Sequence, residues 1–282
     1  MITFIGTGLL GANFTKALIK KGEKVRVWNR TFERAKALEA DGAVAVQDIA
    51  EAVKGIDRIH ITLSDDASVD AVLAQAKPGL SKGTILIDHT TTTEKGAVRR
   101  TAEFAKEGIT YVHVPVFMGP SNALESTGVM LISGDQAVVE KVEPWISLMT
   151  GKVLNFGDKT GKAAGIKLMG NLFLLTMTGG FSDMLALAKS LEIPSADLNT
   201  LFESWNPGSM APARLKKITA GNFEDPSWEL RMARKDARLM IEEAGNGGKT
   251  LNVIPSIAAQ MDKWIEKGKG DKDWTIIASD NL

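Results

Sequence analysis

Residues 2–11 read ITFIGTGLLG, and this stretch decides the fold, because four strand-forming residues lead straight into a G-x-G-x-x-G turn. A helical pattern follows, so the turn joins a strand to a helix. In this context Gly6 permits a tight turn, Gly8 lets the backbone approach a pyrophosphate, and Gly11 allows close helix–strand packing. The free N–H groups of the helix N-terminus attract the anion. We therefore predict a dinucleotide-binding turn; the alternative is a glycine turn without a ligand.

Short β-rich runs alternate with longer amphipathic runs through the first half of the chain. This alternation predicts an α/β domain with a doubly wound parallel sheet of the Rossmann type, over residues 1–158. Two later strand-like runs, 129–133 and 152–156, flank a helix near 136–149 and are expected to extend that sheet. The five principal strands are expected near residues 2–5, 24–28, 58–63, 84–88 and 110–114.

Beyond the first domain only helical patterns remain, so residues 159–282 are predicted to form an all-α domain. A long helix from about 160 to about 190 begins it and joins the two domains. Its apolar residues are too many for a one-sided surface helix, which indicates burial on several sides. Shorter helices are expected near residues 195–204, 210–220, 228–245 and 252–267.

Composition limits the partners and the compartment. The 34 Lys and Arg residues balance 34 Asp and Glu residues, so the charge does not indicate nucleic acid or an anionic membrane as a partner. The absence of cysteine excludes disulfides and thiolate metal sites and is compatible with a reducing compartment. We see neither a signal peptide nor an unbroken apolar run of roughly 18 residues. The expectation is a cytoplasmic protein that binds a small molecule and does not enter a membrane.

The end of the second strand suggests which dinucleotide is bound. An NAD enzyme usually places Asp or Glu there to hold the ribose hydroxyls, and this chain has none. Asn29 and Thr31 instead offer hydrogen bonds, Arg30 offers a planar cation, and Arg34 follows one helical turn later, a set that suits a 2′-phosphate. We predict NADP(H). The alternative is that Arg30 is a solvated surface arginine and that NAD(H) is also used.

Four further segments carry recognisable motifs: DHTTT at 88–92, VPVFMG at 114–119, GKAAGIKLMGN at 161–171, and Lys235-Asp236 with Leu239. Together with the glycine turn they resemble the β-hydroxyacid dehydrogenases, the family of 3-hydroxyisobutyrate dehydrogenase, tartronate semialdehyde reductase and glyoxylate or succinic semialdehyde reductases, related to 6-phosphogluconate dehydrogenase. The resemblance spans nearly the whole chain. It implies an active site between the two domains and a homodimer or homotetramer formed through the helical domain.

Lys167 is the predicted general acid and base. Reduction of a carbonyl by a nicotinamide needs a proton at the oxygen, and the resemblance places this lysine where the family has its own. Burial, or a neighbouring cation such as Lys235, would lower its pKa toward the working range. Asn171 lies on the same helix face one turn later and could hold the substrate oxygen or orient the lysine. The alternative is a solvated helix lysine beside a structural asparagine.

The resemblance assigns the remaining site residues. Thr90 would touch the substrate and Thr91 the nicotinamide ribose, although threonines at a strand end can merely cap the next helix. Lys235 could reach a cofactor or substrate anion, whereas Asp236 suits an ion pair or cap. The predicted cofactor residues are Gly6, Thr7, Gly8, Leu9, Leu10, Gly11, Asn29, Arg30, Thr31, Leu63, Ser64, Val69, Thr91 and Lys235.

The substrate loop departs from the family pattern. The family that this chain resembles has Ser-Gly where this chain has Phe117 and Met118, and it uses that loop to hold a small carboxylate. Gly119 is retained. Two bulky apolar side chains make the pocket smaller or less polar. We expect an NADP(H)-dependent oxidoreductase that interconverts a small hydroxy acid with its semialdehyde or keto form. The alternatives are an NADPH-dependent imine reductase and a non-catalytic dinucleotide-binding protein. His60, His89 and His113 show no metal-ligand spacing, and no metal is expected.

Overall fold

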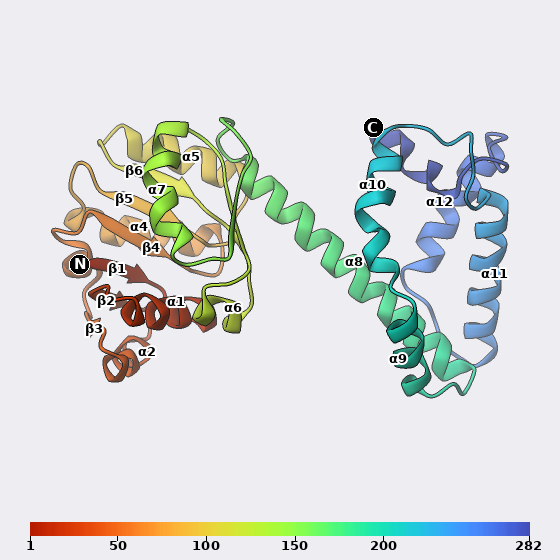
Figure 1. Cartoon of the computed structure of the whole chain (residues 1–282), viewed down its shortest axis with the longest axis horizontal. Helices are drawn as coiled ribbons and strands as arrows, with labels where there is room; N and C mark the ends of the chain where they lie inside the picture. The colour runs from red at the N-terminus through yellow and green to blue at the C-terminus, as the bar shows by residue number, and fades with distance from the viewer. The chain divides into compact units, whose positions relative to one another are not determined.

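The structure is a computed structural model that describes all 282 residues. By its internal contacts the chain divides into two compact units, Met1–Asn171 and Leu172–Leu282. The boundary placed from sequence, 158/159, lies in the loop before helix α8 (Lys162–Ser190), whereas the contact division falls inside that helix. The reason is local: the first turns of α8 pack on the sheet unit, where Phe117 meets Gly170. Figure 1 labels most of the helices and the strands β1–β6.

The first unit is built on a six-stranded parallel sheet in the order β3-β2-β1-β4-β5-β6, which confirms the predicted α/β class. All five principal strands form, and the short β3 was not foreseen because two residues make no period-2 pattern. The strands are β1 (Ile2–Ile5), β2 (Val25–Trp28), β3 (Val44–Ala45), β4 (Arg58–Ile61), β5 (Ile85–Asp88) and β6 (Thr110–His113).

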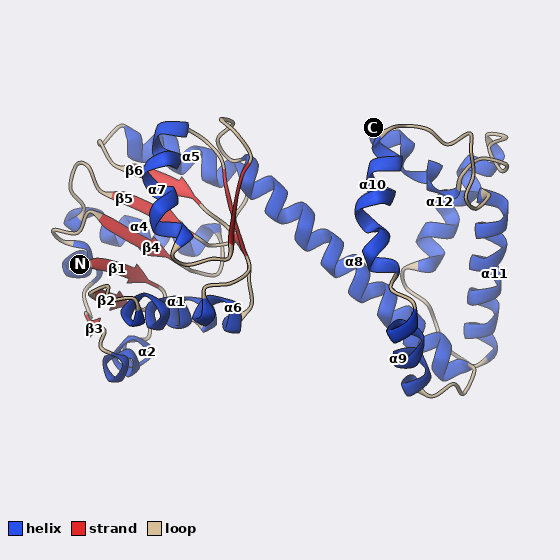
Figure 2. Ribbon diagram, viewed as in Figure 1, coloured by secondary structure: helices blue, strands red, loops and turns tan.

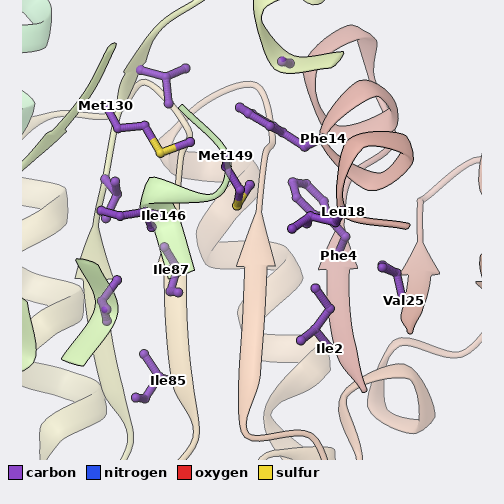
Figure 3. Packing of buried hydrophobic residues seen from close by; sticks show 14 of the residues in the cluster. Ile2, Phe4, Phe14, Leu18, Val25, Ile85, Ile87, Met130, Ile146 and Met149 are labelled. Atoms are coloured by element: carbon purple, nitrogen blue, oxygen red, sulfur yellow. The ribbon is translucent and has the colours of Figure 1, made fainter. Parts of the chain in front are cut away.

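Helices cover both faces of this sheet (Figure 2). One face packs against α1, α2, α6 and α7, and the other against α3, α4 and α5. Since both faces are buried, the strands are almost wholly apolar, and neighbours such as Phe4 and Ile5 enter opposite cores. Figure 3 shows the first core, where Phe14 and Leu18 of α1 lie beside Phe4. The helices are α1 (Leu9–Lys20), α2 (Phe32–Lys36), α3 (Ile49–Val53), α4 (Asp66–Ala76), α5 (Glu94–Ala105), α6 (Pro120–Glu125) and α7 (Gln136–Ser147).

The prediction that the two later strands extend the main sheet was wrong. They form β8 (Val129–Ile132) and β9 (Lys152–Asn155) of a separate three-stranded sheet, ordered β7-β8-β9. Pro115 explains the separation, because it has no N–H to continue the ladder beyond β6. Its carbonyl instead accepts a hydrogen bond from Leu131 N–H at 2.9 Å, and β7 (Val116–Phe117) then pairs antiparallel with β8.

The second unit is helical, as predicted, with helix ends within about two residues of those expected. Leu230, Phe223 and Met261 belong to its small core. Asp273, fully buried, binds Lys217 Nζ at 2.5 Å and two backbone N–H groups. The elements after α8 are α9 (Ser195–Ser204), α10 (Ala211–Thr219), α11 (Leu230–Asn246), α12 (Ile254–Glu266) and the 3₁₀ segment η4 (Trp274–Asn281).

Helix α8 is not buried on several sides in the single chain, so that prediction was wrong. From Leu168 to Leu185 it exposes many large apolar side chains, and by length and composition α8 is the one helix that could cross a membrane. One of its turns is nevertheless packed against protein, since the buried Asp183 accepts hydrogen bonds from the backbone N–H groups of residues 252–254 at 2.7–3.0 Å. The exposed residues include Leu172, Phe173, Leu174, Leu175, Met177, Phe181 and Leu185.

Candidate active site

The glycine turn after β1 has the geometry that its motif predicts. Gly6 has φ +90°, and a Cβ there would lie 2.1 Å from the carbonyl oxygen of Thr62. A Cβ on Gly11 would lie 1.9 Å from the carbonyl oxygen of Gly6. By contrast, a Cβ on Gly8 would meet nothing within 4 Å. The fold itself therefore requires the first and third glycines, while the second borders open space, where a pyrophosphate can approach the backbone.

Asn29 ties this turn to the end of β2. Its Oδ1 accepts a hydrogen bond from Thr7 N–H at 3.1 Å, and its Nδ2 donates to the carbonyl of Thr31 at 2.9 Å. Arg30 is exposed and forms no ion pair, and the same is true of Arg34. Two exposed, unpaired guanidinium groups shortly after the end of β2 suit a dinucleotide with a 2′-phosphate.

The side chain of Leu9 is also accessible to a dinucleotide, since 77% of its surface is exposed at the start of α1. The other predicted cofactor residues divide into accessible and inaccessible ones. Ser64 is exposed and shares a hydrogen bond with Ser68 at 2.9 Å. Val69 is fully buried in the core between the sheet and helices α3, α4 and α5, so it offers no surface to a ligand.

The two threonines after β5 have different environments. Thr90 is only 1% exposed, and its hydroxyl accepts a hydrogen bond from Leu63 N–H at 2.9 Å. Its own N–H donates to Asp88 Oδ1 at 2.9 Å. Thr90 thus links the ends of β4 and β5 rather than presenting a free hydroxyl. Thr91 is half-exposed and is the residue here that can meet a ligand.

A buried polar network below these threonines was not recognised from the sequence. Tyr111 OH donates to Asp88 Oδ2 at 2.5 Å and lies 3.4 Å from Arg100 Nη1. Arg100, 1% exposed, also binds Asp66 and Asp70. Burial, reinforced by Asp88, raises the pKa of the Tyr111 phenol. The available signal was the tyrosine and aspartate within two buried strands, since buried polar groups need partners.

The three histidines belong to the interior. His89 Nδ1 lies 2.9 Å from the carbonyl of Val114, and its Nε2 lies 3.0 Å from His60 Nδ1. His113 Nε2 lies 2.8 Å from the carbonyl of Thr90. Because carbonyl oxygens only accept, His89 Nδ1 and His113 Nε2 carry the protons. Burial lowers the pKa of all three rings, to about 4 for His89, so they are neutral near pH 7. No three His, Asp or Glu side chains are grouped as metal ligands.

The structure brings Lys167, Asn171 and Phe117 together at the start of α8. Lys167 is 8% exposed, and its Nζ donates to Asn171 Oδ1 at 3.0 Å. The same nitrogen lies 4.1 Å from the centre of the Phe117 ring. No carboxylate pairs with it, and burial lowers the pKa of the Lys167 amine. An amine held in one direction, away from water and without a counter-ion, can exchange a proton with a ligand.

The rest of the substrate loop is less open to ligands. Gly119 N–H donates to Asn122 Oδ1 at 2.9 Å, within the first turn of α6. Met118 is half-buried against the main core. Lys235 lies in the second unit, on α11, where it is exposed and its Nζ lies 2.7 Å from Asp236 Oδ1. Asp236 therefore forms the ion pair that was expected of it.

Comparison with known proteins adds three similarities. Residues 1–157 match the family defined by the NAD binding domain of 6-phosphogluconate dehydrogenase. The chain is 25% identical to glyoxylate/succinic semialdehyde reductase 1 of Arabidopsis thaliana over 284 residues, which cover 98% of this chain and 96% of that protein. It is 25% identical to 2-(hydroxymethyl)glutarate dehydrogenase of Eubacterium barkeri over 281 residues, with 98% and 93% covered. A solved imine reductase from Myxococcus stipitatus in complex with NADP+ has a TM-score of 0.92 at 20% identity, covering 99% of this chain and 98% of that one; this likeness shows the fold.

Proposed function

Because the chain belongs to the β-hydroxyacid dehydrogenase family, we propose that it is an NADP(H)-dependent oxidoreductase that interconverts a small hydroxy acid with its semialdehyde or keto form. One observation carries the proposal: Lys167 is buried, has no counter-ion and is held by Asn171. Similarity to a glyoxylate/succinic semialdehyde reductase and to a hydroxy-acid dehydrogenase, each over more than nine-tenths of its length, supports the same reaction class.

The cofactor supplies the hydride when it is bound. The turn after β1 would hold its pyrophosphate at Gly8 and the N-terminus of α1, where open space and free backbone N–H groups are present. Arg30 would bind the 2′-phosphate, since its guanidinium is exposed and unpaired. Thr91 would contact the nicotinamide ribose from the end of β5. NAD(H) remains usable in principle because nothing at the end of β2 repels it.

Lys167 would donate a proton to the carbonyl oxygen during reduction and take it back from the hydroxyl during oxidation. The lowered pKa of its amine favours both directions, because an acid–base catalyst works best when its pKa approaches the ambient pH. Asn171 accepts one N–H of the lysine, so the amine keeps its remaining protons and its direction for the substrate.

The loop around Phe117 narrows the substrate class. A phenyl ring donates no hydrogen bond, and the N–H of Gly119 is already taken by Asn122. A carboxylate has few donors here, so the substrate is a small aldehyde acid bound by other groups or a less polar carbonyl compound. The same apolar loop favours the second candidate function, an NADPH-dependent imine reductase, whereas Lys167 favours the carbonyl reaction.

The exposed apolar side chains of the helical unit support a homodimer or homotetramer. Large apolar residues are exposed along α8, and further along the chain Leu201 of α9, Trp205 just after α9 and Leu215 of α10 are exposed as well. Soluble monomers rarely expose so much apolar surface, and a second copy of the chain would cover it. We propose a cytoplasmic oligomer without membrane or nucleic-acid partners. Light scattering of the wild type and of Leu175→Lys tests this: a single monomeric species in the wild type contradicts it.

The decisive experiment compares Lys167→Ala with Lys162→Ala, a matched control because Lys162 is an exposed lysine on the same helix. NADPH oxidation is measured with glyoxylate, succinic semialdehyde, uncharged aldehydes and a cyclic imine. We expect Lys167→Ala to lower kcat about 10²–10⁴-fold and the control to match the wild type. An unchanged kcat removes the lysine from the mechanism. Turnover of the imine alone favours the second candidate, and NADPH binding without any turnover favours a non-catalytic role.

A further inference from the structure

The ring of Phe117 is seated in a notch on α8. Gly170 creates this notch: a Cβ there would lie 2.2 Å from Phe117 Cζ and 2.8 Å from Cε1. Gly170 stands three residues after Lys167 and one before Asn171, so all three lie on one face of the helix. The tip of the ring therefore reaches the helix backbone at the place where the amine is held.

The amine of Lys167 is bounded on two sides by this arrangement. The face of the Phe117 ring lies 4.1 Å from Nζ, and Asn171 Oδ1 accepts its hydrogen bond at 3.0 Å. A lysine side chain has four rotatable bonds and, left free, would move its amine over several ångströms. A ring on one side and an amide on the other restrict it to one direction.

We propose that Phe117 is a positioning residue for the Lys167 amine, and that the notch at Gly170 exists to seat its ring. The catalytic consequence rests on the proposed function, but the placement of the amine does not. Phe117 is the last residue of β7, directly before the turn that leads into α6, so a residue of the sheet unit controls the direction of a group on helix α8. The aromatic residue thus replaces a substrate-binding contact with a contact to the catalytic group.

Gly170→Ala tests the notch, and Gly165→Ala is its matched control. Both change glycine to alanine within α8 and improve helix propensity equally, but a Cβ at Gly165 meets nothing within 4 Å. Gly170→Ala must displace the ring. Phe117→Leu removes the aromatic face while keeping an apolar side chain, and it leaves the helix unchanged. The second variant decides the matter if the first does not fold.

The first readout needs no turnover. Acetic anhydride labels lysine amines at rates that report their exposure and protonation, and mass spectrometry follows Lys167 beside the exposed Lys162 as internal reference. We expect Lys167 to be labelled severalfold faster in Gly170→Ala and Phe117→Leu than in the wild type, and Gly165→Ala to match the wild type. Equal Lys167 labelling in all four proteins overturns the proposal, whether or not the protein has the proposed activity.

The second readout is kinetic and separates positioning from general damage. Misplacing a catalytic group by about 1 Å can cost about 10²-fold, so we expect kcat to fall about 10- to 100-fold in Gly170→Ala and Phe117→Leu, with the KM for NADPH unchanged. In a Lys167→Ala background neither change should lower kcat further, because there is no amine left to position. Equal losses with and without the lysine would show that Phe117 acts in some other way.

Discussion

Acidification from pH 6.5 to pH 4 should destabilise the sheet unit, and His89 gives the magnitude. Burial lowers its pKa to about 4, while an unfolded histidine has a pKa of 6.5. Between these values the unfolded chain binds more protons than the folded one, so stability is fully present above pH 6.5 and is lost as the pH falls toward 4. The gap of about 2.5 pH units, at 1.36 kcal/mol each, corresponds to about 3 kcal/mol. His60 and His113 act in the same direction because burial lowers the pKa of both.

The assay is amide hydrogen exchange of peptides from β4 and β5, which reports the opening free energy of this unit apart from the helical one. His89→Gln is the comparison, since glutamine is neutral, can donate to Val114 O and can accept from His60 Nδ1. We expect the wild type to lose up to about 1.4 kcal/mol per pH unit more than the variant between pH 6.5 and 4. Parallel losses in the two proteins would refute the reasoning, as would an NMR titration of His89 centred near pH 6.5.

Three further predictions concern other parts of the chain. Arg30→Ala should raise the KM for NADPH about tenfold or more and leave the KM for NADH nearly unchanged, and equal effects would contradict the 2′-phosphate assignment. Gly8→Ala should abolish NADPH binding in calorimetry without lowering the melting temperature, because the added Cβ has open space. Gly11→Ala should lower the free energy of unfolding by about 1–3 kcal/mol, because the added Cβ would lie 1.9 Å from the carbonyl oxygen of Gly6. Asp183→Asn should destabilise the helical unit by about 1–3 kcal/mol in hydrogen exchange, since an amide cannot accept all three N–H bonds; normal protection of α12 would count against this.

Local patterns predicted the features that depend on local chemistry. The glycine turn was recognisable because backbone conformation and helix–strand packing allow only glycine at Gly6 and Gly11. The contact between Lys167 and Asn171 follows from a spacing of four residues on one helix. The five strands followed from runs of apolar, β-branched residues.

Features that depend on distant partners were not predictable in the same way. The strand pattern of 129–133 does not say which neighbour it will pair with, and Pro115 directed it to β7. Thr90 looks like a free hydroxyl until Leu63 and Asp88 are placed beside it. The exposed segment of α8 from Leu168 to Leu185 has the composition of a buried helix. Composition indicates that a surface will be covered, but it does not indicate which molecule covers it.

The bridge made by Asn29 bears on attempts to change the coenzyme. Converting such enzymes to the unphosphorylated coenzyme usually means installing an acid at the end of the second strand. Here an aspartate at position 29 would still accept a hydrogen bond from Thr7 N–H. Its second carboxylate oxygen would, however, face the carbonyl oxygen of Thr31, and this repulsion would loosen the cofactor-binding turn. Residue 30 is the better position for an acid, because the exposed side chain of Arg30 makes no contact on which the turn depends.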